Sequence, residues 1–102
     1  MPKPPLFFKL ESVVATAEEV AAQSEDRWAR KRIGSELIPA LYEARTYVEV
    51  GQISAPEVRL AIAKAADAAR DLVDTDPKFA PLLSRIRILM EDASAASHPK
   101  RQ

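Results

Sequence analysis

The spacing of apolar residues constrains this chain more than any other feature of its sequence. Between residues 6 and 96, apolar side chains recur at every third or fourth position, which is the repeat of one face of an α-helix. The alternation of apolar and polar residues that is typical of a half-buried strand does not occur, and the only glycines are Gly34 and Gly51. The pattern therefore predicts an all-α fold.

The first segment is predicted to be one long helix from about residue 6 to about residue 32. Its expected buried stripe consists of Leu6, Leu10, Val13, Val14, Ala17, Ala21, Ser24 and Trp28. Ile33 lies off this stripe and Gly34 follows it, so we expect the helix to break there. Trp28 is accordingly expected in the core.

A second helix is predicted to begin after this break. Ser35 is expected to cap it, with Pro39 in its first turn or just beyond. The alternative is a single kinked helix that runs through Pro39. Gly51 is expected to end the segment in a left-handed conformation. The expected buried row is Leu37, Leu41, Ala44 and Val48.

The third helix has the clearest start signal. The tetrapeptide SAPE at residues 54–57 is typical of a capping box with proline inside the first turn, and the helix is expected to end near Asp74. Its expected buried face is Val58, Ala61, Ile62, Ala65, Ala69, Leu72 and Val73.

The last helix follows a short linker. Asp76 or Thr75 is expected to cap a turn begun by Pro77, and the helix then runs from Pro77 or Pro81 to about Ala96. Its expected buried residues are Phe79, Leu82, Leu83, Ile86, Leu89, Met90 and Ala93.

These segments define the expected architecture. Short connections favour antiparallel neighbours, so we expect a small antiparallel bundle of three to four helices with a long N-terminal helix. A chain of 102 residues suffices for one domain. We divide it into an extended, proline-rich arm (1–5), a single helical-bundle domain (6–97) and a frayed C-terminal tail (98–102).

The residue types present exclude several kinds of chemistry. The chain has no cysteine, which excludes disulfides, thiol catalysis, zinc–thiolate sites and iron–sulfur ligation. The single histidine, His98, lies in the expected tail, where no preorganised catalytic role is expected. Two isolated glycines do not form a phosphate-binding loop. We therefore expect a protein that is not an enzyme and binds no cofactor or metal.

Charge and hydropathy bear on location and partners. The 15 basic and 15 acidic residues cancel, so the basic excess of a dedicated nucleic-acid binder is missing and long-range self-repulsion is weak. No apolar run approaches the roughly 20 residues that span a bilayer, and the N-terminus lacks a secretory signal. We expect a cytoplasmic protein that does not contact membranes.

Residues 27–32 hold four positive charges around the only tryptophan. With Trp28 turned inward, Arg27, Arg30 and Lys31 are expected on one flank of the helix and Arg32 on the other. Three interpretations of this basic flank stay open, namely a solvated helix flank, a docking surface for a protein, and a surface that contacts nucleic-acid phosphates.

An acidic row is expected on the outer face of the third helix. Asp67, Asp71 and Asp74 follow one another at i, i+4 and i+7, and near a helix C-terminus such carboxylates oppose the helix dipole. The row serves solubility, with Arg70 offsetting part of its charge, or docks a basic partner, or binds a hard cation. We also hypothesise that it pairs with the basic flank, within one molecule or across a dimer.

Phe8, Leu60 and Ile88 fall off the buried faces of their helices. Three such residues on a small, uncharged bundle favour self-association or a partner surface. The leading hypothesis is therefore a non-enzymatic subunit, adaptor or inhibitor that works by protein–protein contact, with a homodimer as the expected state.

Two other functions stay open. One is a nucleic-acid-binding accessory subunit that uses the basic flank, aided by Arg85, Arg87, Lys100 and Arg101. The other is a hydrolase or metal site near Asp67 and Asp71.

Overall fold

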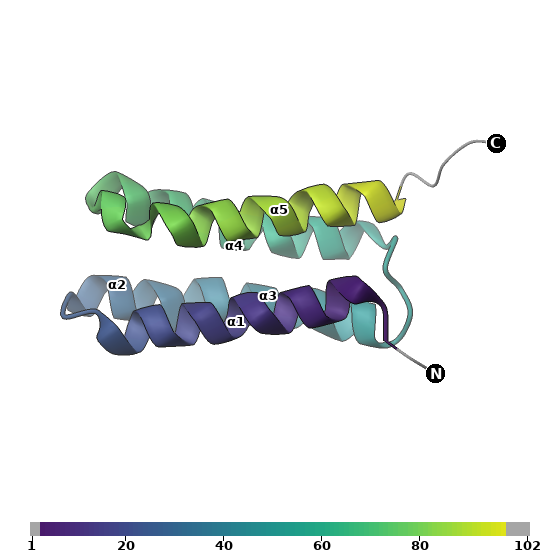
Figure 1. Cartoon of the computed structure of the whole chain (residues 1–102), viewed down its shortest axis with the longest axis horizontal. Coiled ribbons are helices and arrows are strands. Elements are labelled where there is room, and N and C mark those ends of the chain that lie inside the picture. The colour runs from purple at the N-terminus through teal and green to yellow at the C-terminus, as the bar shows by residue number, and fades with distance from the viewer. Residues whose placement is uncertain (1–2, 98–102) are drawn as a thin grey trace.

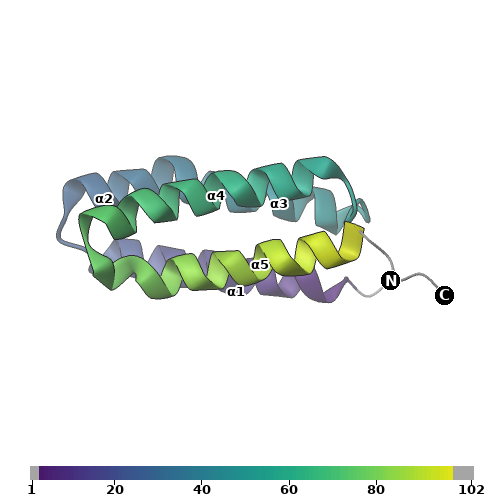
Figure 2. The same ribbon diagram turned by 90° about the horizontal axis from the view of Figure 1, so that it is seen from above.

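The computed structural model describes residues 3–97, which form four helical rods in an up-down-up-down bundle. Figure 1 shows α4 and α5 in one layer above α1 and the α2–α3 rod, with consecutive rods running in opposite directions. Seen from above in Figure 2, α1 and α5 lie along one face of the bundle and α3 and α4 along the other. The expected all-α antiparallel bundle is confirmed.

The first rod is α1 (Pro5–Gln23), which begins at the end of the expected arm, with Pro4 as its N-cap. It ends well before residue 32, so the predicted length of this helix is wrong. Asp26 accepts hydrogen bonds from the backbone N–H groups of Trp28 and Ala29, at 2.9 and 3.3 Å, and therefore starts a new helix. Residues 24–26 form the turn between the two rods, and Ser24 is buried there.

The second rod is continuous through three segments, α2 (Arg27–Arg32), the π-helical η1 (Ile33–Leu37) and α3 (Ile38–Glu49). The predicted break at Gly34 and the predicted N-cap at Ser35 are wrong. Of the alternative, a single kinked helix through Pro39, the continuity is confirmed. Pro39 has no N–H to donate and its ring crowds the carbonyl of Ser35. The wider π turn accommodates it, with the N–H of Ile38 donating to the carbonyl of Ile33.

The new start at Asp26 also changes which side of the rod faces the core. Ala29 and Ile33 are fully buried, in line with Leu37 and Leu41. Trp28 is 44% exposed, so the prediction that it lies in the core is wrong. The error arose because the stripe was extended through a turn that resets the helical phase.

The third rod is α4 (Pro56–Thr75). Gly51, at φ 88°, ends the preceding rod as predicted. Pro56 occupies the first turn of α4 as predicted, but Ala55 is the N-cap and no side chain caps the helix. The capping box at residues 54–57 is therefore not formed, because the helix starts one residue later than Ser54 would require.

The fourth rod is η2 (Pro77–Phe79) followed by α5 (Ala80–Ser97). The side chain of Asp76 accepts from the N–H of Lys78 at 3.1 Å, which confirms the predicted cap. The expected tail, 98–102, lies outside the described residues.

The core lies between the four rods and is almost wholly aliphatic. Its largest fully buried side chains are Leu10, Ile33, Leu37, Leu41, Ile62, Leu72, Ile86, Leu89, Val48 and Val58. Val73 and Met90, which were expected in the core, are only partly buried and pack against it. Within the part of the chain that the structure describes, no helix is both long and apolar enough to cross a membrane.

Candidate interaction surface

The residues singled out in the sequence do not converge on one site. Phe8 lies on α1, the basic flank on α2, Leu60 and the acidic row on α4, and Ile88 on α5. All of these side chains are exposed. The structure therefore divides them among several faces of the bundle.

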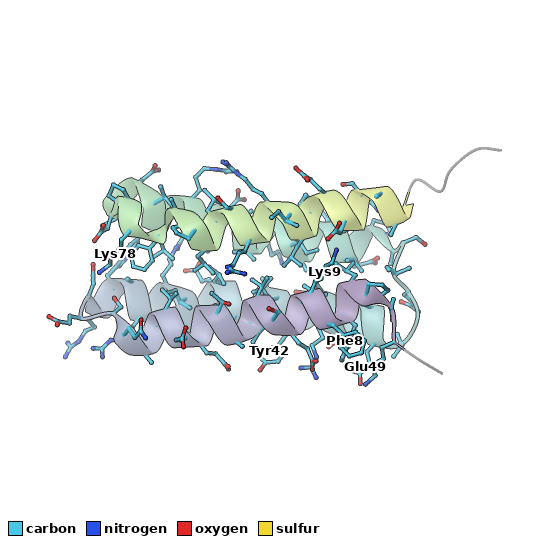
Figure 3. The ribbon with its side chains drawn as sticks, viewed as in Figure 1. Phe8, Lys9, Tyr42, Glu49 and Lys78 are labelled. Carbon is cyan, nitrogen blue, oxygen red and sulfur yellow. The ribbon has the colours of Figure 1, made fainter. Side chains whose placement is uncertain are left out.

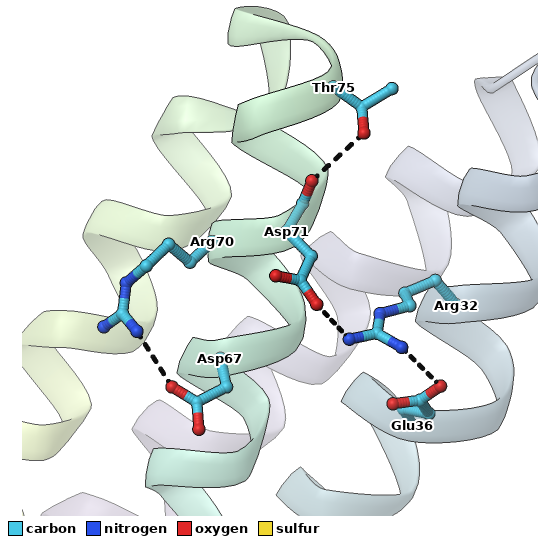
Figure 4. A network of polar contacts seen from close by, with 6 residues as sticks. All are labelled: Arg32, Glu36, Asp67, Arg70, Asp71 and Thr75. Atoms are coloured by element: carbon cyan, nitrogen blue, oxygen red, sulfur yellow. Dashed lines mark hydrogen bonds and ion pairs between the residues drawn. The ribbon is translucent and has the colours of Figure 1, made fainter.

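Arg32 joins α2 to α4 on the face formed by α3 and α4 (Figure 4). Its guanidinium donates to the carboxylate of Glu36 at 2.7 Å and also to that of Asp71. A basic residue of the 27–32 stretch thus does pair with the acidic row within one molecule. It is Arg32, however, and not a member of the expected basic flank.

The other members of the acidic row behave differently. Asp67 accepts from Arg70 at 2.9 Å within its own helix, as Figure 4 shows. Among residues 3–97, Asp74, Arg27, Arg30 and Lys31 have no ion pair. These three cations lie on the same short helix as the exposed Trp28.

A polar groove of about 440 Å³ runs between the second rod and α4. Its lining includes the cations Arg32 and Lys64 and the acids Glu36, Glu43 and Asp67. Charges of both signs line it, and arginines already bind Asp67 and Asp71. Over residues 3–97, no group of three or more acidic, histidine or cysteine side chains is placed to hold a metal ion.

Aromatic and basic side chains cover the junction of α1 with α3. The Arg45 guanidinium lies 5.2 Å from the ring centre of Phe7 and 5.5 Å from that of Tyr42, and also pairs with Glu11 at 3.2 Å. Phe8 packs edge-on against Phe7, with ring centres 5.4 Å apart. Figure 3 shows Phe8 and Tyr42 on the side of the bundle away from α4 and α5.

Tyr42 was not among the residues selected from the sequence, although a signal for it was present. It directly follows Leu41 of the predicted buried row, and a neighbour in sequence points about 100° away on a helix. Arg45 gave no such signal, because its contacts depend on how α1 and α3 are aligned.

A second groove, of about 230 Å³, runs between α1 and α5. Val13 and Leu89 are its buried floor, and Ile88, 54% exposed, stands beside them. Lys9 and Arg85 are its basic rims, and Lys9 donates to Asp92 at 2.8 Å across the two helices. The apolar floor and the basic rims distinguish this groove from the polar one between α3 and α4.

The fold and its surface define a class, namely an up-down-up-down four-helix bundle that presents large apolar side chains to solvent. In comparisons with known proteins, no family model matches the chain, and neither a curated protein nor a solved structure shows significant similarity to it.

Proposed function

We propose that this chain is a small, non-enzymatic, cytoplasmic helical protein that acts through protein–protein contacts, as a subunit, adaptor or inhibitor of a larger assembly. We further propose that it self-associates and that the homodimer is its main oligomeric state.

One observation carries the proposal. Large apolar side chains are exposed on all four rods, and none of them belongs to the cluster of buried side chains that forms the core. They are Phe8, Trp28, Tyr42, Val50, Leu60 and Ile88, between 41% and 67% exposed. A single exposed apolar residue is normal on a soluble protein. Six on a bundle of this size, with no net charge to keep copies apart, favour burial against another protein.

Sedimentation velocity of the full chain over a range of micromolar concentrations tests the self-association. We expect the weight-average sedimentation coefficient to rise with concentration toward that of a dimer. A single compact monomer at every concentration would refute the homodimer.

A second candidate function is a nucleic-acid-binding accessory role, and the exposure of Trp28 is the observation that favours it. An exposed indole on the same helix as Arg27, Arg30 and Lys31, which have no ion pair among residues 3–97, suits base stacking together with phosphate contacts.

Titration with a single-stranded oligonucleotide, followed by Trp28 fluorescence, tests this role. If it is correct, quenching occurs and weakens steeply with salt, and the variant Arg27→Glu/Arg30→Glu loses it. The matched control is Arg59→Glu/Arg70→Glu, which carries the same charge change on α4. Equal loss in both variants would show that only net charge matters.

A further inference from the structure

We propose that the face formed by α1 and α5 binds a second copy of this chain across a two-fold axis between Ile88 and Leu89, with α5 of each copy antiparallel to the other. This inference rests on the proposed self-association and assigns it a surface.

Charges of opposite sign lie two turns apart on α5. Arg85 and Asp92 are seven residues apart, which is about two helical turns, so they lie on the same side of the helix. Both lie on the side toward α1, because Arg85 lines the α1–α5 groove and Asp92 binds Lys9 of α1. The midpoint between them falls between Ile88 and Leu89, both of which line the same groove.

A two-fold axis brings opposite charges of the two copies together. An axis perpendicular to α5 between Ile88 and Leu89 exchanges positions on either side of it, so Arg85 of each copy meets Asp92 of the other. The ion pair forms twice, and the two Ile88 side chains lie next to the axis. In a parallel arrangement of the two α5 helices, Arg85 would instead meet Arg85 of the other copy.

Arg85 and Asp92 differ in their ion pairs within the single chain. Across the described residues Arg85 has no ion pair, whereas Asp92 has one, with Lys9. In the dimer Asp92 lies between Lys9 of its own chain and Arg85 of the second copy, and the guanidinium gains the partner that it lacks. Ile88 and the groove floor of Val13 and Leu89 supply the apolar centre.

The size of the face sets the expected affinity. With 19 and 18 residues, α1 and α5 are each about 27 Å long at 1.5 Å per residue. Two helices of this length, each about 10 Å wide, offer roughly 550 Å² per copy, near the low end for specific interfaces. A face of this size with a small apolar centre belongs with the weak, transient interfaces, so we expect a dissociation constant in the micromolar range.

Two charge-reversal variants, Arg85→Asp and Asp92→Arg, test the arrangement. Each homodimer would bring like charges together twice, so we expect its dissociation constant to rise about tenfold or more. An equimolar mixture of the two variants forms both ion pairs again, in a heterodimer, and should recover affinity to within about threefold of the original chain. Sedimentation velocity of each variant and of the mixture measures this, and far-UV circular dichroism checks that both variants fold.

Ile88→Asp provides a second variant, with Leu60→Asp as its matched control, because Leu60 is 63% exposed but lies on α4. We expect Ile88→Asp to abolish the dimer and Leu60→Asp to leave it intact. If the original chain dimerises but the mixture shows no recovery and Ile88→Asp still dimerises, the face is wrong while self-association stands. If the original chain is a monomer at every concentration, the self-association itself fails.

Discussion

The guanidinium of Arg32 donates to the carboxylate of Asp71 and thereby joins the second rod to α4, 39 positions away along the chain. The same guanidinium binds Glu36 one turn further along its own rod. The pair is partly exposed to solvent, which limits what it contributes to stability.

A double-mutant cycle over Arg32→Ala and Asp71→Ala measures this contribution. We expect a coupling energy of about 0.2–1 kcal/mol, the range for exposed ion pairs, and its decrease at high salt. The matched cycle Arg70→Ala with Asp67→Ala, a pair within one helix, should give about 0.2–0.5 kcal/mol. A coupling of several kcal/mol for Arg32 and Asp71 would mean that the pair is buried in solution.

Asp26 sets both the start and the phase of the second rod. Asp26→Ala removes the acceptor of two backbone N–H groups and should lower the free energy of unfolding by about 0.5–2 kcal/mol. Asp26→Asn, which keeps a capping oxygen, should restore most of the loss, and Glu25→Ala is the control next to it. Urea denaturation measures all three, and an unchanged midpoint for Asp26→Ala would contradict the assigned cap.

The phase of the second rod predicts opposite responses at two adjacent residues. Trp28→Ala should change the free energy of unfolding by less than about 1 kcal/mol, because nearly half of the indole is exposed and it lies outside the core. Ala29→Leu should cost about 1–3 kcal/mol, because Ala29 is fully buried and extra methylenes overpack the core. Fluorescence adds a direct check, since Trp28 in the folded monomer should be readily quenched by iodide. A protected, blue-shifted emission at low concentration would restore the core position that the sequence predicted.

The two glycines should respond in opposite directions to alanine. Gly34 lies inside a helix with open space around it, so Gly34→Ala should stabilise the fold by about 0.4–1 kcal/mol. Gly51 has a φ of 88°, and Gly51→Ala should cost about 1–2 kcal/mol. Thermal or urea unfolding compares them, and destabilisation by Gly34→Ala would show that the continuous rod is wrong at that residue.

Helical periodicity was sufficient to predict the fold class, the end of α4 near Asp74, and most of the core. It failed between residues 24 and 39. Ser24 is buried in the structure, as the predicted stripe indicates. The side-chain cap at Asp26, however, competes with continuation of the helix, and a local cap leaves no periodic pattern in the sequence. Pro39 fits the first turn of a new helix as well as a kinked helix that continues through it, and the sequence does not show the π turn that lets the helix continue.

The surface was predictable residue by residue but not as an arrangement. Phe8, Leu60 and Ile88 are exposed as their phases indicated. That Ile88 shares a groove with Lys9 and Arg85, while Phe8 joins the cluster around Arg45, depends on the alignment of α1 with its two neighbours. This alignment is fixed by packing between distant parts of the chain, which a single sequence does not display.

A single introduced cysteine tests the central claim most directly, because the chain has none of its own. In a dimer with its two-fold axis between Ile88 and Leu89, the two copies of Ile88 lie next to the axis and therefore close to each other. A disulfide requires Cβ atoms about 3.5–4.5 Å apart. Under mild oxidation at micromolar concentration, Ile88→Cys should therefore form a covalent dimer rapidly, and Leu60→Cys, at a more exposed position on α4, should not. Equal and slow cross-linking of both variants, at the rate of random collision, would contradict the account.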